Sequence, residues 1–264
     1  MNIKIVRWNN RLGNNITQLI NVLKYATLMN YNVIIPSHQF FKNNYIVINP
    51  LVKRSDGIVE AGVFFKSKDL KLKNFDNRKV DFEKVLHHLR SIFNFSLLKK
   101  TPDLDENTVV IHIRSGDIFK NCIHPAYIPP PFSYYENILD NISFSKIILV
   151  SENDANPCVK LLIEKYKNKI IYKKNSLVLD ISILLNAKIL IESFGSFSNN
   201  LILFSNNLEK LYKPSYQGKN LFEVYDKNSF EIHRINLKEY HKKMKPWKAK
   251  RSQLDLIKNY RRKL

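Results

Sequence analysis

The chain has 264 residues, of which 44% are hydrophobic and 12% aromatic, so it can bury a core of ordinary size and is not a disordered, collagen-like, coiled-coil or disulfide-scaffold protein. Its 43 Lys and Arg against 23 Asp and Glu leave a net charge of +20, which favours a polyanionic partner: nucleic acid, anionic lipid or a phosphorylated small molecule. The two cysteines, Cys122 and Cys158, have no C-x-x-C partner, so neither a cysteine zinc site nor a disulfide framework is expected. Without a long apolar stretch or a secretion signal, we expect a cytoplasmic protein.

The first hundred residues predict a small α/β domain. Apolar periodicity and a Gly-containing turn indicate strand, turn and helix at the amino terminus, and Asp81 is suited to cap a later helix. The expected elements are strands at 3–6 and 33–35 and helices at 16–26 and 82–89. Residues 37–75 have no clean period. A polar, Pro-containing stretch at 101–107 suits a linker, so the sequence predicts an N-terminal domain over 1–105.

The following residues alternate short apolar runs with helical stretches, which is typical of a parallel sheet covered on both faces. The expected strands are 109–113, 146–150, 169–172, 188–191 and 210–213, and the clearest helices are 155–166 and 176–186. They define a second α/β domain over 106–222, followed by a basic, partly helical tail over 223–264. Because ligands of open parallel sheets bind beyond the carboxyl ends of the strands, the residues that follow these runs are the first candidates for a site.

The run after the 109–113 strand begins at His112 and reads H-I-R-S-G-D. On an alternating strand His112 and Arg114 point to the same side, and Ser-Gly-Asp turns the chain where a ligand would sit. An Arg suits a diphosphate there because its guanidinium forks two donors onto phosphate oxygens and keeps its charge. The alternative interpretation is an Arg paired with a nearby carboxylate.

Two further segments are candidates for a site. Residues 192–200 follow the 188–191 strand, and a helix that begins at Ser198 would offer free N–H groups and hydroxyls to an anion, although a Ser there can also simply cap the helix. The turn at 11–15 matches neither the P-loop nor the dinucleotide-binding Gly pattern, which disfavours both classes. This turn is equally compatible with a purely structural role.

In order and spacing, these segments resemble the α-1,2-fucosyltransferase family and, more distantly, the α-1,6- and protein O-fucosyltransferases. Residues 11–15 look like the family's G-R-L-G-N-Q turn, with Asn10 in place of its first Gly and Asn15 in place of its Gln. The segment from His112 is similar to H-x-R-R-G-D, with Ser115 in place of the second Arg.

The resemblance extends to 180–185, similar to D-x-x-x-L-M, and to 196–200, similar to N-S-T-F-S-W-W without the Trp pair. In all it covers residues 7–18 and 109–205. It implies a GT-B-like α/β fold, in which two Rossmann-like α/β halves face a cleft.

The resemblance also implies roles for single residues. Arg114 would hold the β-phosphate of a GDP-sugar, and His112 and Asp180 would contact guanine. A carboxylate suits guanine, whose Watson–Crick edge offers two N–H donors, although Asp180 on a core helix could instead cap or pair. The remaining donor-binding candidates are Arg11, Gly13, Asn14, Ser196, Phe197, Ser198 and Asn199.

Inverting sugar transfer needs a base for the acceptor hydroxyl and charge stabilisation for the leaving nucleotide. Asp117, in the turn itself, and His124, in the Pro-rich loop that contains Tyr127, are the candidates for the base, and Asp117 is preferred. No D-x-D sequence follows a strand, so we expect no metal and no other cofactor. Arg114 and the helix terminus in 192–200 would then stabilise the diphosphate charge in place of a metal.

The sequence therefore predicts a cytoplasmic, metal-independent, inverting glycosyltransferase. It would transfer fucose or a related sugar from a GDP-sugar to a glycan acceptor in surface polysaccharide or lipopolysaccharide biosynthesis. The alternatives are a basic nucleic-acid-binding protein, for which no recognition motif is visible, and a non-catalytic glycan-binding relative.

The carboxyl-terminal tail carries half of the excess positive charge. From Arg234 to Leu264 there are twelve Lys or Arg against Glu239 and Asp255, a net charge of +10. The basic residues flank Trp247, a composition suited to anionic headgroups with an aromatic residue at the interface. We expect this tail to dock on an anionic membrane surface, the alternative being an ordinary solvated terminus.

Overall fold

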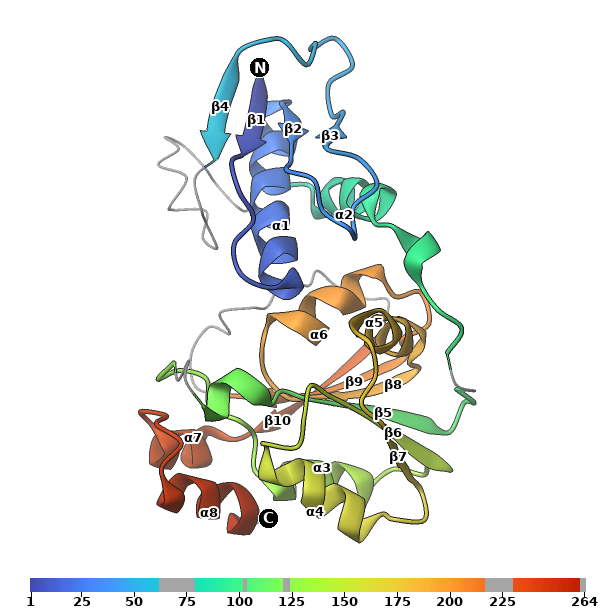
Figure 1. The fold of residues 1–264 in the computed structure, drawn as a ribbon, viewed down its shortest axis with the longest axis vertical. Helices are drawn as coiled ribbons and strands as arrows, with labels where there is room; N and C mark the ends of the chain where they lie inside the picture. The colour runs from blue at the N-terminus through green and yellow to red at the C-terminus, as the bar shows by residue number, and fades with distance from the viewer. Residues whose placement is uncertain (62–78, 102–103, 121–123, 217–229, 262–264) are drawn as a thin grey trace. The chain divides into compact units, whose positions relative to one another are not determined.

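The computed structural model describes residues 1–61, 79–101, 104–120, 124–216 and 230–261, and the chain divides into two compact units, 1–98 and 99–264 (Figure 1). Cys122 and the domain boundary predicted between residues 222 and 223 lie outside the described residues. In the described part of the chain, no helix is long and apolar enough to cross a membrane.

The first unit contains a sheet with the strand order β3-β2-β1-β4, in which β1 pairs in parallel with β2 and β4, and β3 is antiparallel to β2. The strands are β1 (Asn2–Ile5), β2 (Asn32–Ile34), β3 (Tyr45–Ile46) and β4 (Ile58–Ala61). The helices are α1 (Leu12–Met29), α2 (Phe82–Ile92) and a 3₁₀ turn at Phe95–Leu97.

The local sequence explains both α-helices of this unit. Ile16, Leu19, Ile20 and Leu23 recur at helical spacing on α1 and are at most 1% exposed, so the helix is held by its buried stripe. Helix α2 begins after Asp81, whose Oδ1 accepts a hydrogen bond of 3.2 Å from the backbone N–H of Lys84, which confirms the predicted cap.

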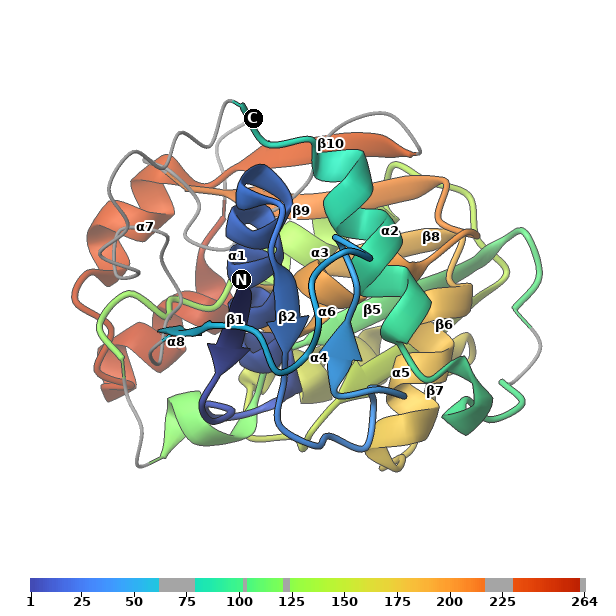
Figure 2. The same cartoon turned by 90° about the horizontal axis from the view of Figure 1, so that it is seen from above.

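The second unit is built on a sheet with the strand order β10-β9-β8-β5-β6-β7, in which every pair is parallel (Figure 2). The strands are β5 (Thr108–Ile113), β6 (Lys146–Ser151), β7 (Ile170–Tyr172), β8 (Ile189–Glu192), β9 (Lys210–Ser215) and β10 (Glu231–Asn236). Five of the six strands were predicted to within two residues at each end, and β10 was not. The apolar runs of β5 and β6 are buried on both faces, as in the middle of a parallel sheet, whereas β7 at the edge is only partly buried.

Helices cover both faces of this sheet, with α5 and α6 on one face and α3, α4 and α8 on the other (Figure 1). The bounds are α3 (Phe132–Leu139), α4 (Pro157–Lys165), α5 (Leu177–Asn186), α6 (Ser196–Leu201), α7 (Lys238–Met244) and α8 (Arg251–Asn259), with 3₁₀ turns at Gly116–Phe119 and Ile202–Phe204. The predicted α/β class is confirmed: each unit carries a sheet of mainly parallel strands together with helices.

The basic tail differs from its prediction, because residues 231–261 pack into the second unit. Strand β10 extends the sheet, and α8 packs on α3 and α4. Trp247 is fully buried, and its Nε1–H donates a hydrogen bond of 2.9 Å to the carbonyl of Ile118. The expectation that Trp247 would lie at a membrane interface is therefore wrong: this ring is part of the core, where truncating a large aromatic costs about 3–5 kcal/mol.

Candidate active site

Arg114 directly follows β5, and its backbone is held from both sides. Its N–H donates a hydrogen bond of 2.8 Å to the Ser193 hydroxyl at the end of β8. Its carbonyl accepts one of 3.0 Å from the Asn156 side chain at the start of α4. The strand that leads to Arg114 is buried throughout, so the position of this residue is set by the core of the second unit.

The Arg114 guanidinium lies among three different groups. It stands over the Tyr127 ring, 4.6 Å from the centroid, and Nη2 is 3.5 Å from Oδ2 of Asp117. On a third side it lies so close to Gly195 that a Cβ added there would be 2.8 Å from Nη1. The side chain retains 23% exposure. A guanidinium held this way is oriented yet open to a ligand.

Arg114 lies at the carboxyl end of β5, the edge at which parallel sheets bind ligands. The chain leaves β5 toward α3 on one face and leaves the neighbouring strand β8 toward α6 on the other. The loops after these two strands therefore diverge, which opens a crevice at their carboxyl ends. Arg114 follows the first strand and Gly195 the second, so the two segments singled out in the sequence meet at this switch point.

His112, the other polar residue of the β5 segment, is 7% exposed, and among the described residues its Nδ1 has no hydrogen-bond partner. Burial, with a smaller contribution from the Arg114 charge, lowers the pKa of His112 to about 3. The imidazole is therefore neutral near pH 7. Its ring lies 5.5 Å from that of Phe197 on α6, so these two sequence-predicted residues are neighbours.

The two candidates for the base lie differently around Arg114. Asp117 pairs with the guanidinium, so the alternative interpretation of Arg114, a pairing with a nearby carboxylate, describes part of its surroundings. His124 is exposed, and its ring lies tilted against that of Tyr127, with centroids 4.5 Å apart. Its Nδ1 accepts a hydrogen bond of 3.2 Å from the Ala126 N–H. Of the two candidates, Asp117 is thus the one in contact with Arg114.

Ser115, which departs from the resembled H-x-R-R-G-D pattern, is 2% exposed. Its hydroxyl donates to Oδ1 of Asn153 over 2.7 Å and accepts from the Asn156 N–H over 2.9 Å, which joins the turn to the loop after β6. The next residue, Gly116, has a φ of 71°, and a Cβ there would be 2.6 Å from the Glu152 carboxylate. The positive φ therefore favours glycine at 116, and an Arg at 115 would have no acceptor for the Asn156 N–H.

Helix α6 begins at Ser196, two residues earlier than the sequence suggested, after Gly195 with a φ of 127°. The Ser198 hydroxyl donates to Oε2 of Glu192 over 3.2 Å, and Oδ1 of Asn199 accepts from Nζ of Lys213 over 3.4 Å. These two side chains are thus turned toward the protein interior. Ser196 and Phe197 precede them at the start of the helix.

Sequence reasoning missed Lys213, and it included Glu192 in the candidate segment 192–200 without giving it a role. Nζ of Lys213 lies 3.5 Å from Oε1 of Glu192, and the two side chains are 4% and 5% exposed. Removing one partner of such a pair costs about 3–5 kcal/mol, because the other charge stays buried. The available signal was a Lys inside the apolar run of β9, since a charged residue on a buried strand needs a partner.

Asp180 lies on α5, and its Oδ1 accepts a hydrogen bond of 3.0 Å from the Asn175 side chain in the segment before the helix. Burial raises the pKa of the Asp180 carboxyl. The helix itself is capped by Ser176, whose hydroxyl accepts from the Leu179 N–H over 3.3 Å. Asp180 is therefore not the cap, and its contact with guanine stays a prediction.

The amino-terminal turn belongs to the first unit. Asn10, which stands for the first Gly of the resembled turn, has a φ of 60°, a left-handed conformation that Asn tolerates better than most residues. Arg11 is the N-cap of α1, and Gly13, which is buried, and Asn14 lie in the first turn of the helix. The roles of Arg11, Gly13 and Asn14 in donor binding stay predictions.

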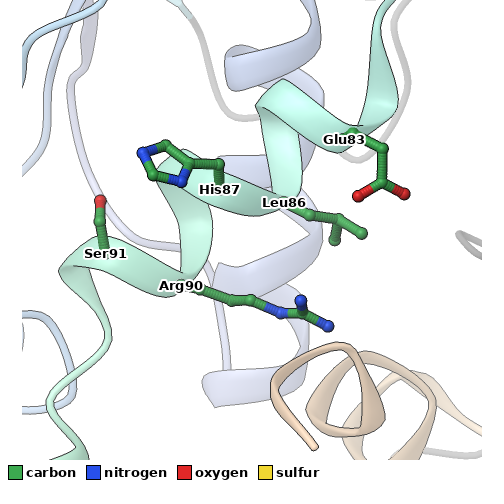
Figure 3. Close-up of a pocket in the computed structure, with 5 residues that line it drawn as sticks. All are labelled: Glu83, Leu86, His87, Arg90 and Ser91. Atoms are coloured by element: carbon green, nitrogen blue, oxygen red, sulfur yellow. The ribbon is translucent and has the colours of Figure 1, made fainter. Parts of the chain in front are cut away.

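A pocket in the first unit is lined by one face of α2 (Figure 3). Its lining residues are Glu83, Leu86, His87, Arg90 and Ser91. None of them is a sequence-predicted site residue. Across the described ranges, no group of three or more His, Cys, Asp or Glu side chains is arranged to hold a metal ion.

Among the solved structures to which the chain is similar are three glycosyltransferases. Heptosyltransferase WaaC of E. coli, with ADP-2-deoxy-2-fluoro heptose, has a TM-score of 0.46 at 12% identity, covering 92% of this chain and 98% of its own. POFUT1 in complex with GDP has a TM-score of 0.48 at 9% identity, and the match covers 78% of this chain and 95% of the POFUT1 chain. NodZ α-1,6-fucosyltransferase, soaked with GDP-fucose, has a TM-score of 0.41 at 9% identity, covering 78% and 93%.

No family model and no curated protein matches the sequence. With TM-scores below 0.5, the structural likenesses define neither the family nor the substrate.

Proposed function

We propose that this protein is an inverting glycosyltransferase that transfers fucose or a related sugar from a GDP-sugar to a glycan acceptor in surface polysaccharide or lipopolysaccharide biosynthesis. One observation carries the proposal: Arg114 stands at the switch point between β5 and β8 with its guanidinium oriented by Tyr127, Asp117 and Gly195. The switch point is where parallel sheets bind nucleotides, and a guanidinium there can donate two hydrogen bonds to a departing diphosphate.

In this proposal Arg114 acts on the leaving group. As the bond from the sugar to the diphosphate breaks, negative charge grows on the β-phosphate oxygens, and two parallel N–H donors from a permanently charged group stabilise it. Asp117, in contact with Arg114, takes the proton of the acceptor hydroxyl, and His124 is the second candidate for that step. Because Arg114 supplies the positive charge, the reaction needs no metal ion.

Guanine binding is assigned to His112 and Asp180. The neutral His112 imidazole, whose buried Nδ1 has no partner in the described part of the chain, suits an uncharged base better than a phosphate. The Asp180 carboxylate accepts the paired N–H donors that guanine presents and adenine, uracil and cytosine do not. GDP is therefore the nucleotide that these two side chains favour.

The first expected result is a selective thermal shift. GDP should raise the melting temperature of the protein more than UDP, CMP or ADP does, because a ligand that binds only the native state stabilises it in proportion to its affinity. The four shifts should be unchanged in EDTA. Equal shifts for all four nucleotides would contradict the donor assignment, and hydrolysis of GDP-fucose without acceptor would distinguish an enzyme from a non-catalytic relative.

The protein also docks, in this proposal, on the cytoplasmic face of an anionic membrane through the folded surface of α7, α8 and their connection. Six basic side chains on this surface are exposed: Lys242, Lys243, Lys245, Lys248, Lys250 and Arg251. Lys242 pairs with Glu239 over 3.0 Å. Each basic residue near an anionic surface contributes about 1 kcal/mol, so this face supplies salt-reversible attachment without an inserted aromatic ring.

The second expected result tests this face by charge. Changing Lys243, Lys245, Lys248 and Lys250 to Gln should reduce binding to phosphatidylserine vesicles by roughly a thousandfold, at about 1 kcal/mol for each residue. The matched control changes four exposed basic residues of the first unit, Lys42, Lys53, Arg54 and Lys84, to Gln. Vesicle co-sedimentation at low and high salt is the measurement.

An equal loss in both variants would show that net charge, and not this face, attracts the membrane. Tight, salt-sensitive RNA binding by a protein that ignores nucleotides and vesicles would favour the nucleic-acid alternative.

A further inference from the structure

The buried ion pair of Glu192 and Lys213 lies beside the candidate active site and is not explained by the proposed chemistry. Glu192 ends β8, and Lys213 lies on the neighbouring strand β9. Their charged atoms are 3.5 Å apart, and both side chains are at least 95% buried. Neither charge reaches solvent, so the pair acts only on the groups around it.

Two of the side chains around the pair belong to the first turns of α6. Glu192 accepts the Ser198 hydroxyl over 3.2 Å, and Lys213 donates to the Asn199 side chain over 3.4 Å. Each member of the ion pair thus holds one residue of α6, and these two residues are consecutive. Ser198 is 1% exposed and Asn199 4%, so these contacts are made away from water.

The same strand end also holds Arg114. Ser193, next to Glu192, accepts the Arg114 N–H over 2.8 Å, and Gly195 lies against the guanidinium. Two adjacent residues thus make both contacts: Glu192 is bonded to α6 through Ser198, and Ser193 is bonded to the Arg114 backbone. A displacement of α6 would reach Arg114 through Gly195, which directly precedes the helix.

We infer that Glu192 and Lys213 are positioning residues, which hold α6 in the place where Gly195 and Phe197 complete the nucleotide site around Arg114 and His112. Stability alone does not account for the pair, because well-packed apolar residues of similar volume serve a core equally well or better. The inference rests on the proposed function, since the site that α6 completes is the one assigned there to GDP.

The experiment compares the wild type with the double variant Glu192→Met and Lys213→Met. Both charges are removed together, so no single charge is left buried and the core keeps its volume. The matched control is Lys188→Met, which removes the pairing of Lys188 with Glu106 (3.2 Å) and Glu209 (3.4 Å). Lys188 directly precedes β8, at the opposite end of that strand from α6.

Two measurements are made on each protein: amide hydrogen exchange of residues 196–204 without ligand, and the Kd for GDP by calorimetry. We expect the double variant to stay folded but to melt at a lower temperature, because the buried Ser198 and Asn199 side chains lose these hydrogen-bond partners. It should also exchange these amides faster and bind GDP at least about tenfold more weakly. Lys188→Met should leave both quantities unchanged.

If the α6 amides of the folded double variant exchange as slowly as those of the wild type, the inference is overturned, with or without nucleotide binding. Faster exchange with an unchanged Kd for GDP would overturn it as well, because the pair would then have only a structural role. Faster exchange in a protein whose wild type binds no nucleotide would instead refute the proposed function.

Discussion

Replacing Arg114 with Ala should lower the turnover of sugar transfer by roughly 10²–10³-fold, the loss seen when one preorganised donor to a developing negative charge is removed. The effect should fall mainly on kcat, because the interaction is strongest when the diphosphate departs. Folding should be little affected. The backbone of Arg114 keeps its hydrogen bonds with Ser193 and Asn156, and the lost side-chain contacts are to the partly exposed Asp117 and Tyr127.

Two companion variants sharpen this expectation. Arg114→Lys should recover little activity, because an ammonium keeps the charge but not the fork, nor the flat contact with the Tyr127 ring. Arg261→Ala is the control: this arginine also pairs with a carboxylate, Glu136 at 3.2 Å, but its side chain is 63% exposed on the α8 side of the second unit. Near wild-type turnover in Arg114→Ala would remove Arg114 from the mechanism.

Most of the second unit could be predicted from the sequence because its central strands are parallel and buried. Buried parallel strands appear as short, continuous apolar runs, and the runs at β5, β6 and β8 stand between helices with clear periodicity. Strand β10 lacks this signal. Its side chains alternate between exposed and partly exposed, as expected at the edge of a sheet, so it resembles an ordinary polar segment.

In the first unit, β1, α1 and β2 were predicted, whereas β3 and β4, which lie in or near the stretch without a clean period, were not. Strand β3 has only two residues, too few to show a period, and β4 has a single buried residue, Ala61. Trp247 illustrates a different failure. Six exposed basic residues surround it in sequence, and only the packing of α7 and α8 reveals that this ring points into the core.

The candidate site was predictable only in part. Arg114 and the segment around Gly195 follow predicted strands, so the ligand-binding edge of a parallel sheet brings them together. The pairing of Glu192 with Lys213 joins residues 21 positions apart on neighbouring strands, and no local pattern encodes that distance. Ser115 was visible only as a departure from a motif, and its reason is the loop after β6 that it fastens.

Gly195 offers the most direct test of how the site is assembled. Its backbone has φ 127° and ψ 174°, a region that is accessible essentially only to glycine. A side chain there is strained whatever the space, and its Cβ would also lie 2.8 Å from Nη1 of Arg114. The guanidinium can move aside, but only by leaving the position in which it is now held.

Gly195→Ala should therefore lower the free energy of unfolding by about 1–3 kcal/mol. It should also lower kcat under conditions in which the variant is folded, because Arg114 is displaced.

Gly57→Ala is the matched control. Its Cβ would lie 2.9 Å from Sδ of Met1, the mobile end of a flexible side chain, and Gly57 has no positive φ, so both stability and turnover should stay near the wild type. The measurements are urea unfolding and kcat at a temperature where all three proteins are folded. Wild-type kcat in a destabilised Gly195→Ala would show that Arg114 works without the close approach of this glycine.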